Sequence, residues 1–233
     1  QGPAADMAPP ADLGPPPAGP AKPTLLQREL APVAVAEWMV AGSLADDPVP
    51  EALRGGTFSL PEAGRDRFGM TWAPQATGED GAIPMGNNRV AWAVAPLNVD
   101  GFTNLVVQAD RAAAVFLDGK QMPGDVYGGN SLRAPFLVSP GEHVVAVRLV
   151  NRGRAPQVRL WTSEDPIHLN LADRTAPDWP VGTDYVQWLG VPVLNFEDTA
   201  TRVVARVVEN AHFEETATWH VTLPGQTVTQ IAF

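Results

Sequence analysis

The chain contains no cysteine among its 233 residues. This absence excludes disulfide bonds, cysteine-ligated zinc sites and thiol nucleophiles together. The sequence also lacks an apolar run approaching the roughly 20 residues that a membrane-spanning helix needs. Basic residues are scarce, since 16 Lys and Arg stand against 26 Asp and Glu for a formal net charge of −10. An acidic chain without a Lys/Arg cluster disfavours nucleic acid and anionic lipid as partners.

Catalytic sequence patterns are missing as well. None of the five serines lies in a G-x-S-x-G elbow, and the nearest approach, residues 129–133, lacks the second glycine. The four histidines show neither metal-ligand spacing nor an HExxH motif. Acidic residues fall mainly in loops, where a charged surface explains them. The sequence therefore predicts no catalytic residues in this chain.

Proline is abundant and concentrated at the beginning. Residues 1–30 include the run Pro15-Pro16-Pro17, which neither a helix nor a central strand accommodates. This composition predicts a semi-rigid, solvated tether. Because the chain begins at Gln1 rather than Met, we expect a mature exported form or a fragment. The expected location is extracellular, periplasmic or surface-tethered, in a bacterium.

Short alternating segments follow the tether and predict an all-β protein of two consecutive sandwiches. Residues 31–165 would form the first and residues 166–233 the second. Residues 89–95 and 143–150 alternate cleanly, with Val145, Val147 and Leu149 expected to point inward. Asp118-Gly119 between apolar runs predicts a tight hairpin, because both turn positions need a positive φ.

The second unit shows the same signals at a smaller scale. Strands are predicted at 191–195, 201–208, 218–223 and 227–233, with a Pro224-Gly225 turn before the last. The final strand runs to the end of the sequence, which suggests a continuing polypeptide. An immunoglobulin-like sandwich is the expected architecture of this unit.

Several motifs resemble a known family. They occupy residues 36–42, 68–72, 89–95, 113–120 and 137–149. Together they resemble the galactose-binding-domain-like jelly roll that precedes the catalytic part of many secreted glycoside hydrolases and prolyl-oligopeptidase-type esterases. The resemblance covers about residues 38–161, with Asp118 where that pattern usually has Asn. It implies an accessory module and no activity, because this chain holds no hydrolase domain.

The tryptophans are the strongest hint of a ligand. Four of the seven, Trp38, Trp92, Trp161 and Trp219, are at core parity in their strands and are predicted to be packing residues. Trp179, Tyr185 and Trp188 lie in less regular sequence and are expected either to plug the gap between the units or to bind a partner. The glycine-rich loop with Asp125, Tyr127 and Asn130 is predicted to form a ligand rim at one end of the first sandwich.

Cofactors other than a structural calcium ion are not expected. The candidate calcium ligands are Asp46, Asp47, Asp100 and Asp125, although no loop has ligand spacing. The favoured function is a non-catalytic accessory unit that binds a glycan or a protein partner, within or beside a larger hydrolase. The alternative is an envelope or assembly subunit that pairs through exposed β edges. An enzyme with dispersed acid and base residues is the least favoured.

Overall fold

The computed structural model describes residues 28–122, 131–175, 189–206 and 218–232. Within these ranges nearly all regular structure is antiparallel β-sheet, so the all-β prediction is confirmed. The exceptions are the single-turn helix α1 (Val49–Arg54) and the 3₁₀ turn η1 (Leu171–Asp173). No helix in the described part of the chain has the length and apolar character needed to cross a membrane.

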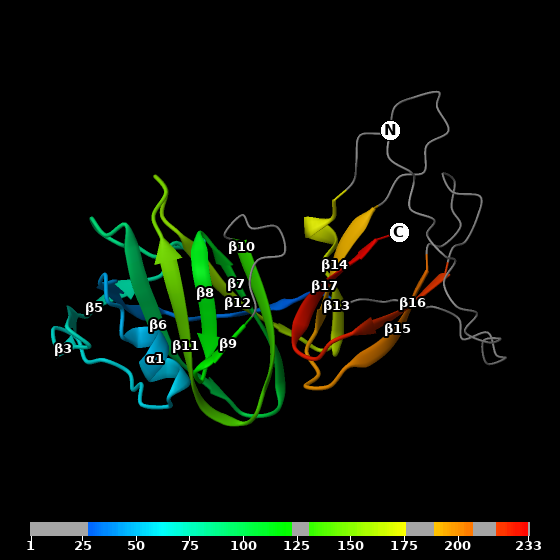
Figure 1. Cartoon of the computed structure of the whole chain (residues 1–233), viewed down its shortest axis with the longest axis horizontal. Coiled ribbons are helices and arrows are strands. Elements are labelled where there is room, and N and C mark those ends of the chain that lie inside the picture. Colours follow the sequence, from blue (N-terminus) through cyan, green and yellow to red (C-terminus); the bar gives the residue numbers. More distant parts are fainter. Residues whose placement is uncertain (1–27, 123–130, 176–188, 207–217, 233) are drawn as a thin grey trace, which may run out of the picture.

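Two sheets packed face to face form the larger unit (Figure 1). The four-stranded sheet has the order β1-β12-β7-β10, from β1 (Ala31–Val33), β12 (Gln157–Ser163), β7 (Thr103–Asp110) and β10 (Ser131–Val138). The six-stranded sheet has the order β5-β2-β6-β11-β8-β9, from β5 (Ala73–Ala76), β2 (Glu37–Gly42), β6 (Val90–Val99), β11 (Gly141–Val150), β8 (Ala112–Leu117) and β9 (Lys120–Gln121). Strands β3 (Asp66–Arg67) and β4 (Met70–Thr71) form a separate short ribbon.

The main core lies between these two sheets and follows the predicted alternation. Val145, Val147 and Leu149 of β11 point into it and are buried, as predicted. They face apolar side chains from β7 and β10, such as Leu105 and Phe136. Period-two alternation places all of these on one face because successive strand side chains point to opposite sides.

A second core covers the other face of the six-stranded sheet. Helix α1 packs Val49 and Leu53 there against Trp92 of β6 and Phe116 of β8. Trp92 is therefore a packing residue, as predicted, but it packs beneath α1 and not between the sheets. The alanines of β6 face the main core instead, because both faces of this strand are covered.

The hairpin between β8 and β9 turns at Asp118 and Gly119, whose φ angles are 47° and 79°. The predicted tight turn with two positive φ values is confirmed. Asp118 also serves the sheet, because its carboxylate accepts hydrogen bonds from the backbone N–H of Val144 (2.8 Å) and from the ring of His143 (2.6 Å). This explains why Asp can replace the usual Asn here.

The smaller unit also consists of two layers (Figure 1). One is the sheet β13-β14-β17, from β13 (Ile167–Leu169), β14 (Gly190–Asn195) and β17 (Thr227–Ala232). The other is the ribbon of β15 (Thr201–Arg206) and β16 (Thr218–Leu223). Val193, Leu223 and Ile231 form the buried centre between them.

The two units meet on the outer face of the four-stranded sheet. Val106 of β7 packs there against Leu194 and Phe196, with Trp161 beside them. Trp161 was predicted to be a packing residue at core parity in its strand; it does pack, but against this contact and not in the main core. Its neighbour Leu160 enters the main core, so Trp161 points outward, and the smaller unit half-buries it. The ammonium group of Lys120 donates a hydrogen bond to the side-chain amide oxygen of Gln226, which adds a contact at the hairpin tip.

Candidate functional site

The candidate site begins with polar side chains on the outer face of the four-stranded sheet. Gln108 of β7 is the register partner of Arg133 on β10 and of Arg159 on β12. Register partners share a face and have adjacent side chains. One row further along, Trp161 of β12 is the partner of Val106. The sheet thus displays two arginines and an amide next to an indole ring.

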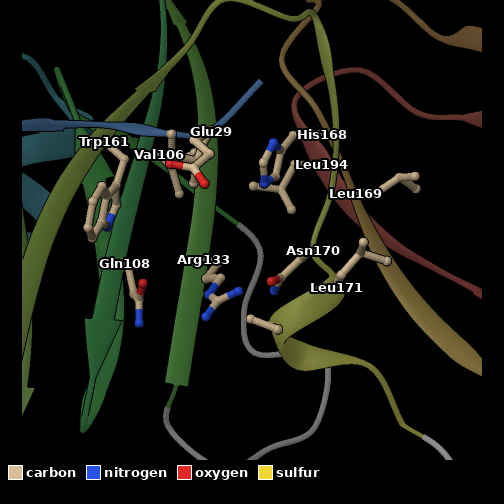
Figure 2. Close-up of a pocket in the computed structure, with 12 residues that line it drawn as sticks. Glu29, Val106, Gln108, Arg133, Trp161, His168, Leu169, Asn170, Leu171 and Leu194 are labelled. Carbon is tan, nitrogen blue, oxygen red and sulfur yellow. The ribbon is translucent and has the colours of Figure 1, made fainter. Parts of the chain in front are cut away.

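A cavity of about 320 Å³ separates this face from the smaller unit. Its volume falls in the range of roughly 300–1,000 Å³ typical of small-molecule sites. Figure 2 shows side chains from the sheet on one wall and from β13, η1 and β14 on the other. The lining residues are Glu29, Leu30, Val106, Gln108, Arg133, Trp161, His168, Leu169, Asn170, Leu171, Ala172 and Leu194.

Two polar side chains of the sheet wall have no side-chain partner among the residues that the structure describes. The structure describes no ion pair and no hydrogen bond for the Arg133 guanidinium or the Gln108 amide within its described residues. Both side chains are half-buried. A polar group that is shielded from water loses more free energy when its hydrogen bonds are missing than an exposed group does. A ligand that supplies those hydrogen bonds therefore gains more at a half-buried group.

Trp161 supplies an apolar surface next to these groups. Its ring is half-buried, and its indole Nε1 is enclosed without a hydrogen-bond partner in the described part of the chain. Leu30, Val106 and Leu194 continue this surface around the cavity. A flat ring beside amide and guanidinium donors is the combination that suits a ligand with one apolar face and several oxygens.

The opposite wall carries His168 and Asn170, both buried. Asn170 holds the start of η1 through its backbone, donating its N–H to the carbonyl of Pro192 (2.8 Å). Burial lowers the pKa of His168, and the positive charge of Arg133 lowers it further, against an opposing effect of Asp165. The imidazole is therefore neutral at neutral pH, and Arg133 is the charged group on the buried side of the cavity.

Comparisons with known proteins give structural likeness only. No protein-family model and no curated protein matches the chain. A GH2 β-galacturonidase from Eisenbergiella tayi bound to galacturonate is similar at 13% identity and a TM-score of 0.40, over 88% of this chain and 36% of that one. An exo-chitosanase from Amycolatopsis orientalis is similar at 14% identity and a TM-score of 0.43, over 88% and 28%. The β-glucuronidase 2 of Bacteroides uniformis is similar at 11% identity and a TM-score of 0.42, over 89% and 27%.

These proteins are much longer than this chain. It spans about a third of the length of the galacturonidase and just over a quarter of the other two.

A second cavity, of about 370 Å³, is lined in part by β1. Trp161 and Trp38 both contribute to its lining, with Arg159 and Glu79 as its charged residues. Trp38 is fully buried, and its Nε1 also lacks a hydrogen-bond partner in the described residues. Part of its lining comes from the small apolar residues of β1 and the segment that follows it, Pro32 to Ala36.

The predicted ligand residues lie outside the residues that the structure describes. This applies to the loop with Asp125, Tyr127 and Asn130 and to the group Trp179, Tyr185 and Trp188. Both groups therefore stay predictions. Of the four tryptophans predicted to pack, Trp38 and Trp92 are fully buried and Trp219 is half-buried.

Asp46, Asp47 and Asp100, the predicted calcium ligands that the structure describes, do not form one cluster. Asp47 accepts hydrogen bonds from the Ser43 hydroxyl (2.8 Å) and the Trp92 indole (2.7 Å), so it holds the start of β6 in place. Asp100 follows the far end of the same strand, and Asp46 is exposed. No group of three or more acidic or histidine side chains positioned for a metal is found in the described ranges. Calcium binding that involves Asp125 stays a prediction.

Sequence reasoning missed Gln108, Arg133 and His168. Each occupies an ordinary polar position of an alternating strand, so nothing in its local sequence marks it. The available signal was the pair of arginines at 133 and 159 on outward positions of an acidic protein, but their adjacency depends on strand order.

Proposed function

We propose that this chain is a non-catalytic β-sandwich unit of an exported protein and that it binds a saccharide in the cavity between its two sandwiches. The observation that carries the proposal is the arrangement of Trp161 beside Gln108 and Arg133, two polar side chains without a partner in the described ranges. The resemblance of residues 38–161 to accessory jelly rolls supports the same reading and suggests a place beside a separate catalytic domain.

Sugars present two kinds of surface, and the cavity offers a match for each. The C–H groups of a pyranose ring form an apolar face that packs on a flat aromatic ring, here the exposed part of Trp161. The hydroxyls need donors and acceptors, which Gln108 and Arg133 supply. Both groups are fixed on neighbouring strands of one sheet, so little ordering is lost on binding.

Binding without cleavage agrees with the charges around the cavity. Glycoside hydrolysis generally uses two carboxyl groups roughly 5–10 Å apart. Among the described residues, Glu29 is the one acidic side chain in the lining, and it is exposed. A single solvated carboxylate supports recognition rather than acid–base chemistry.

Replacing Trp161 tests the proposal. The full chain is screened against a glycan array, and its hits are measured by isothermal titration calorimetry. We expect Trp161→Ala to weaken saccharide binding about tenfold or more, a factor that corresponds to about 1.4 kcal/mol. Phe102→Ala is the matched control, because Phe102 is 76% exposed and does not line the cavity.

Gln108→Ala separates a binding defect from a folding defect. This variant removes one amide from the sheet surface and leaves the apolar contact between the units intact, so we expect weaker binding with an unchanged thermal midpoint. Saccharide binding that survives both Trp161→Ala and Gln108→Ala at full strength would place the site elsewhere. The absence of any saccharide ligand on the array would refute the proposed function itself.

A further inference from the structure

We infer that the saccharide bound in the cavity is an acidic one, a hexuronate whose carboxylate pairs with Arg133. This inference rests on the proposed function and narrows its ligand class. The observation behind it is a half-buried guanidinium that has no ion-pair or hydrogen-bond partner within the described ranges and lines the wall of a cavity of ligand size.

The guanidinium of Arg133 lines the cavity without an ion pair among the described residues. Acidic residues outnumber basic ones by 26 to 16, so a partner for Arg133 would be easy to provide. Half-buried charges are costly unless they are paired, because they lose part of their hydration. A guanidinium on a cavity wall that has no partner among the described residues is therefore suited to an anionic ligand.

Three acidic residues from the neighbouring segments illustrate what the described carboxylates do instead. Asp110, one row along the same face, accepts a hydrogen bond from the Ser131 hydroxyl (2.6 Å). Asp165 accepts the backbone N–H of Arg28 (3.1 Å). Glu29 lines the cavity and is exposed. None of these three forms an ion pair with Arg133.

The opposite wall adds no competing charge. His168 is 7% exposed and uncharged at neutral pH, because burial and the nearby guanidinium lower its pKa. Figure 2 shows the Arg133 side chain extending from the sheet toward Asn170 and η1, across the space that a ligand would fill. The charged side chains of the lining are thus the half-buried Arg133 and the exposed Glu29.

The chemistry of arginine indicates a carboxylate. A guanidinium presents a planar fork of donors that matches the two oxygens of a carboxylate in a bidentate pair. Gln108, the register partner of Arg133, places an amide next to that pair for a neighbouring hydroxyl. Trp161 then packs on the ring that carries both groups. A hexuronate has all three features in one molecule.

Calorimetric titration of the full chain at pH 7.5 with three probes tests this inference. The probes are sodium glucuronate, glucose and sodium acetate. We expect glucuronate to bind at least about tenfold more tightly than glucose, since a charge-assisted pair is added. Acetate should bind more weakly than either sugar, because it lacks the ring that packs on Trp161.

Arg133→Gln is the decisive variant. It removes the charge but keeps a polar side chain of similar reach, and we expect it to reduce glucuronate affinity about tenfold while glucose affinity stays unchanged. Arg202→Gln changes the net charge by the same amount on exposed strand β15 and serves as the matched control. It should leave both affinities as they are.

The possible outcomes separate this inference from the proposed function. Equal affinities for glucose and glucuronate would overturn the acidic ligand and leave saccharide binding standing. Acetate that binds as tightly as glucuronate would also overturn it, since the site would then be a simple anion site. A preference for glucuronate that Arg133→Gln does not reduce would assign the carboxylate to another group and refute the inference.

Discussion

The environments of two histidines shift their pKa values in opposite directions. Partial burial of His143 disfavours its charged form, but the hydrogen bonds with Asp118 and the Ser139 carbonyl, together with the charge of Asp118, outweigh burial and raise its pKa above 6.5. Its contribution to stability is full below pH 6.5 and is lost as the pH rises through the raised value. His168 has a lowered pKa, so protonation favours the unfolded chain. Its environment therefore costs stability as the pH falls below 6.5.

Asp118→Asn isolates the first of these effects. Asn tolerates the positive φ of this turn position and still accepts the Val144 N–H, but it cannot offer a negative charge. We expect the pKa of His143 to fall in this variant, and the stability difference from the parent protein to be larger at pH 5.5 than at pH 8.5.

NMR titration of the imidazole signals and urea unfolding at the two pH values measure these quantities. The His168 signal provides the internal control, since its pKa should lie below 6.5 and stay there in the variant. A pKa of His143 that does not change in Asp118→Asn would contradict the assigned role of the carboxylate.

At the scale of elements, the hairpin between β8 and β9 is held against helix α1. A Cβ at Gly119 would collide with the backbone carbonyl of Leu53, and the residue has a φ of 79°. Arg54 at the end of α1 donates to the Gln121 side chain (3.0 Å) in the same hairpin. The turn therefore serves as a docking point for the helix as well as a reversal of the chain.

We expect Gly119→Ala to lower the free energy of unfolding by about 1–3 kcal/mol, the usual cost of a strained backbone position, with the collision adding to it. Urea denaturation followed by tryptophan fluorescence measures the loss. Gly101→Ala is the control, because that position has open space around it and no positive φ. If the two variants lose equal stability, the contact with α1 has no energetic weight.

At the scale of the whole molecule, the four-stranded sheet contributes one face to each of two apolar contacts. Its inner face packs on the six-stranded sheet, and its outer face packs on Leu194 and Phe196 of the smaller unit. The cavity exists because this second contact is partial: apolar residues close one part of the interface and leave Arg133 and Gln108 facing open space. The proposed ligand site and the apolar contact between the two units therefore lie side by side on one face of the sheet.

Phe196→Ala tests how strongly the units depend on each other. Phe196 is fully buried in the contact between them, and truncating such a side chain typically costs about 3–5 kcal/mol. We expect a large drop in the urea midpoint, or two separate transitions where the parent protein shows one. Val204→Ala, at a 57% exposed position of β15, should change the midpoint little. A midpoint for Phe196→Ala close to that of Val204→Ala would show that the contact contributes little.

Local sequence signals determined most of the strands and the hairpin. The alternation of residues 143–150 and the Asp118-Gly119 turn act between near neighbours, because side-chain direction and turn geometry follow from a few consecutive dihedral angles. Composition alone excludes thiol chemistry, because the sequence contains no cysteine.

Tertiary structure decided which face of each sheet became core and where the candidate site lies. Trp161 reads as a core residue in sequence, yet it points outward because Leu160 takes the inner face and a second sandwich covers the outer one. Arg133, Gln108 and His168 are far apart in the chain, and their meeting depends on strand order, register and the docking of the two units. Those are non-local contacts, whose outcome is set by the packing of whole sheets rather than by any short stretch of residues.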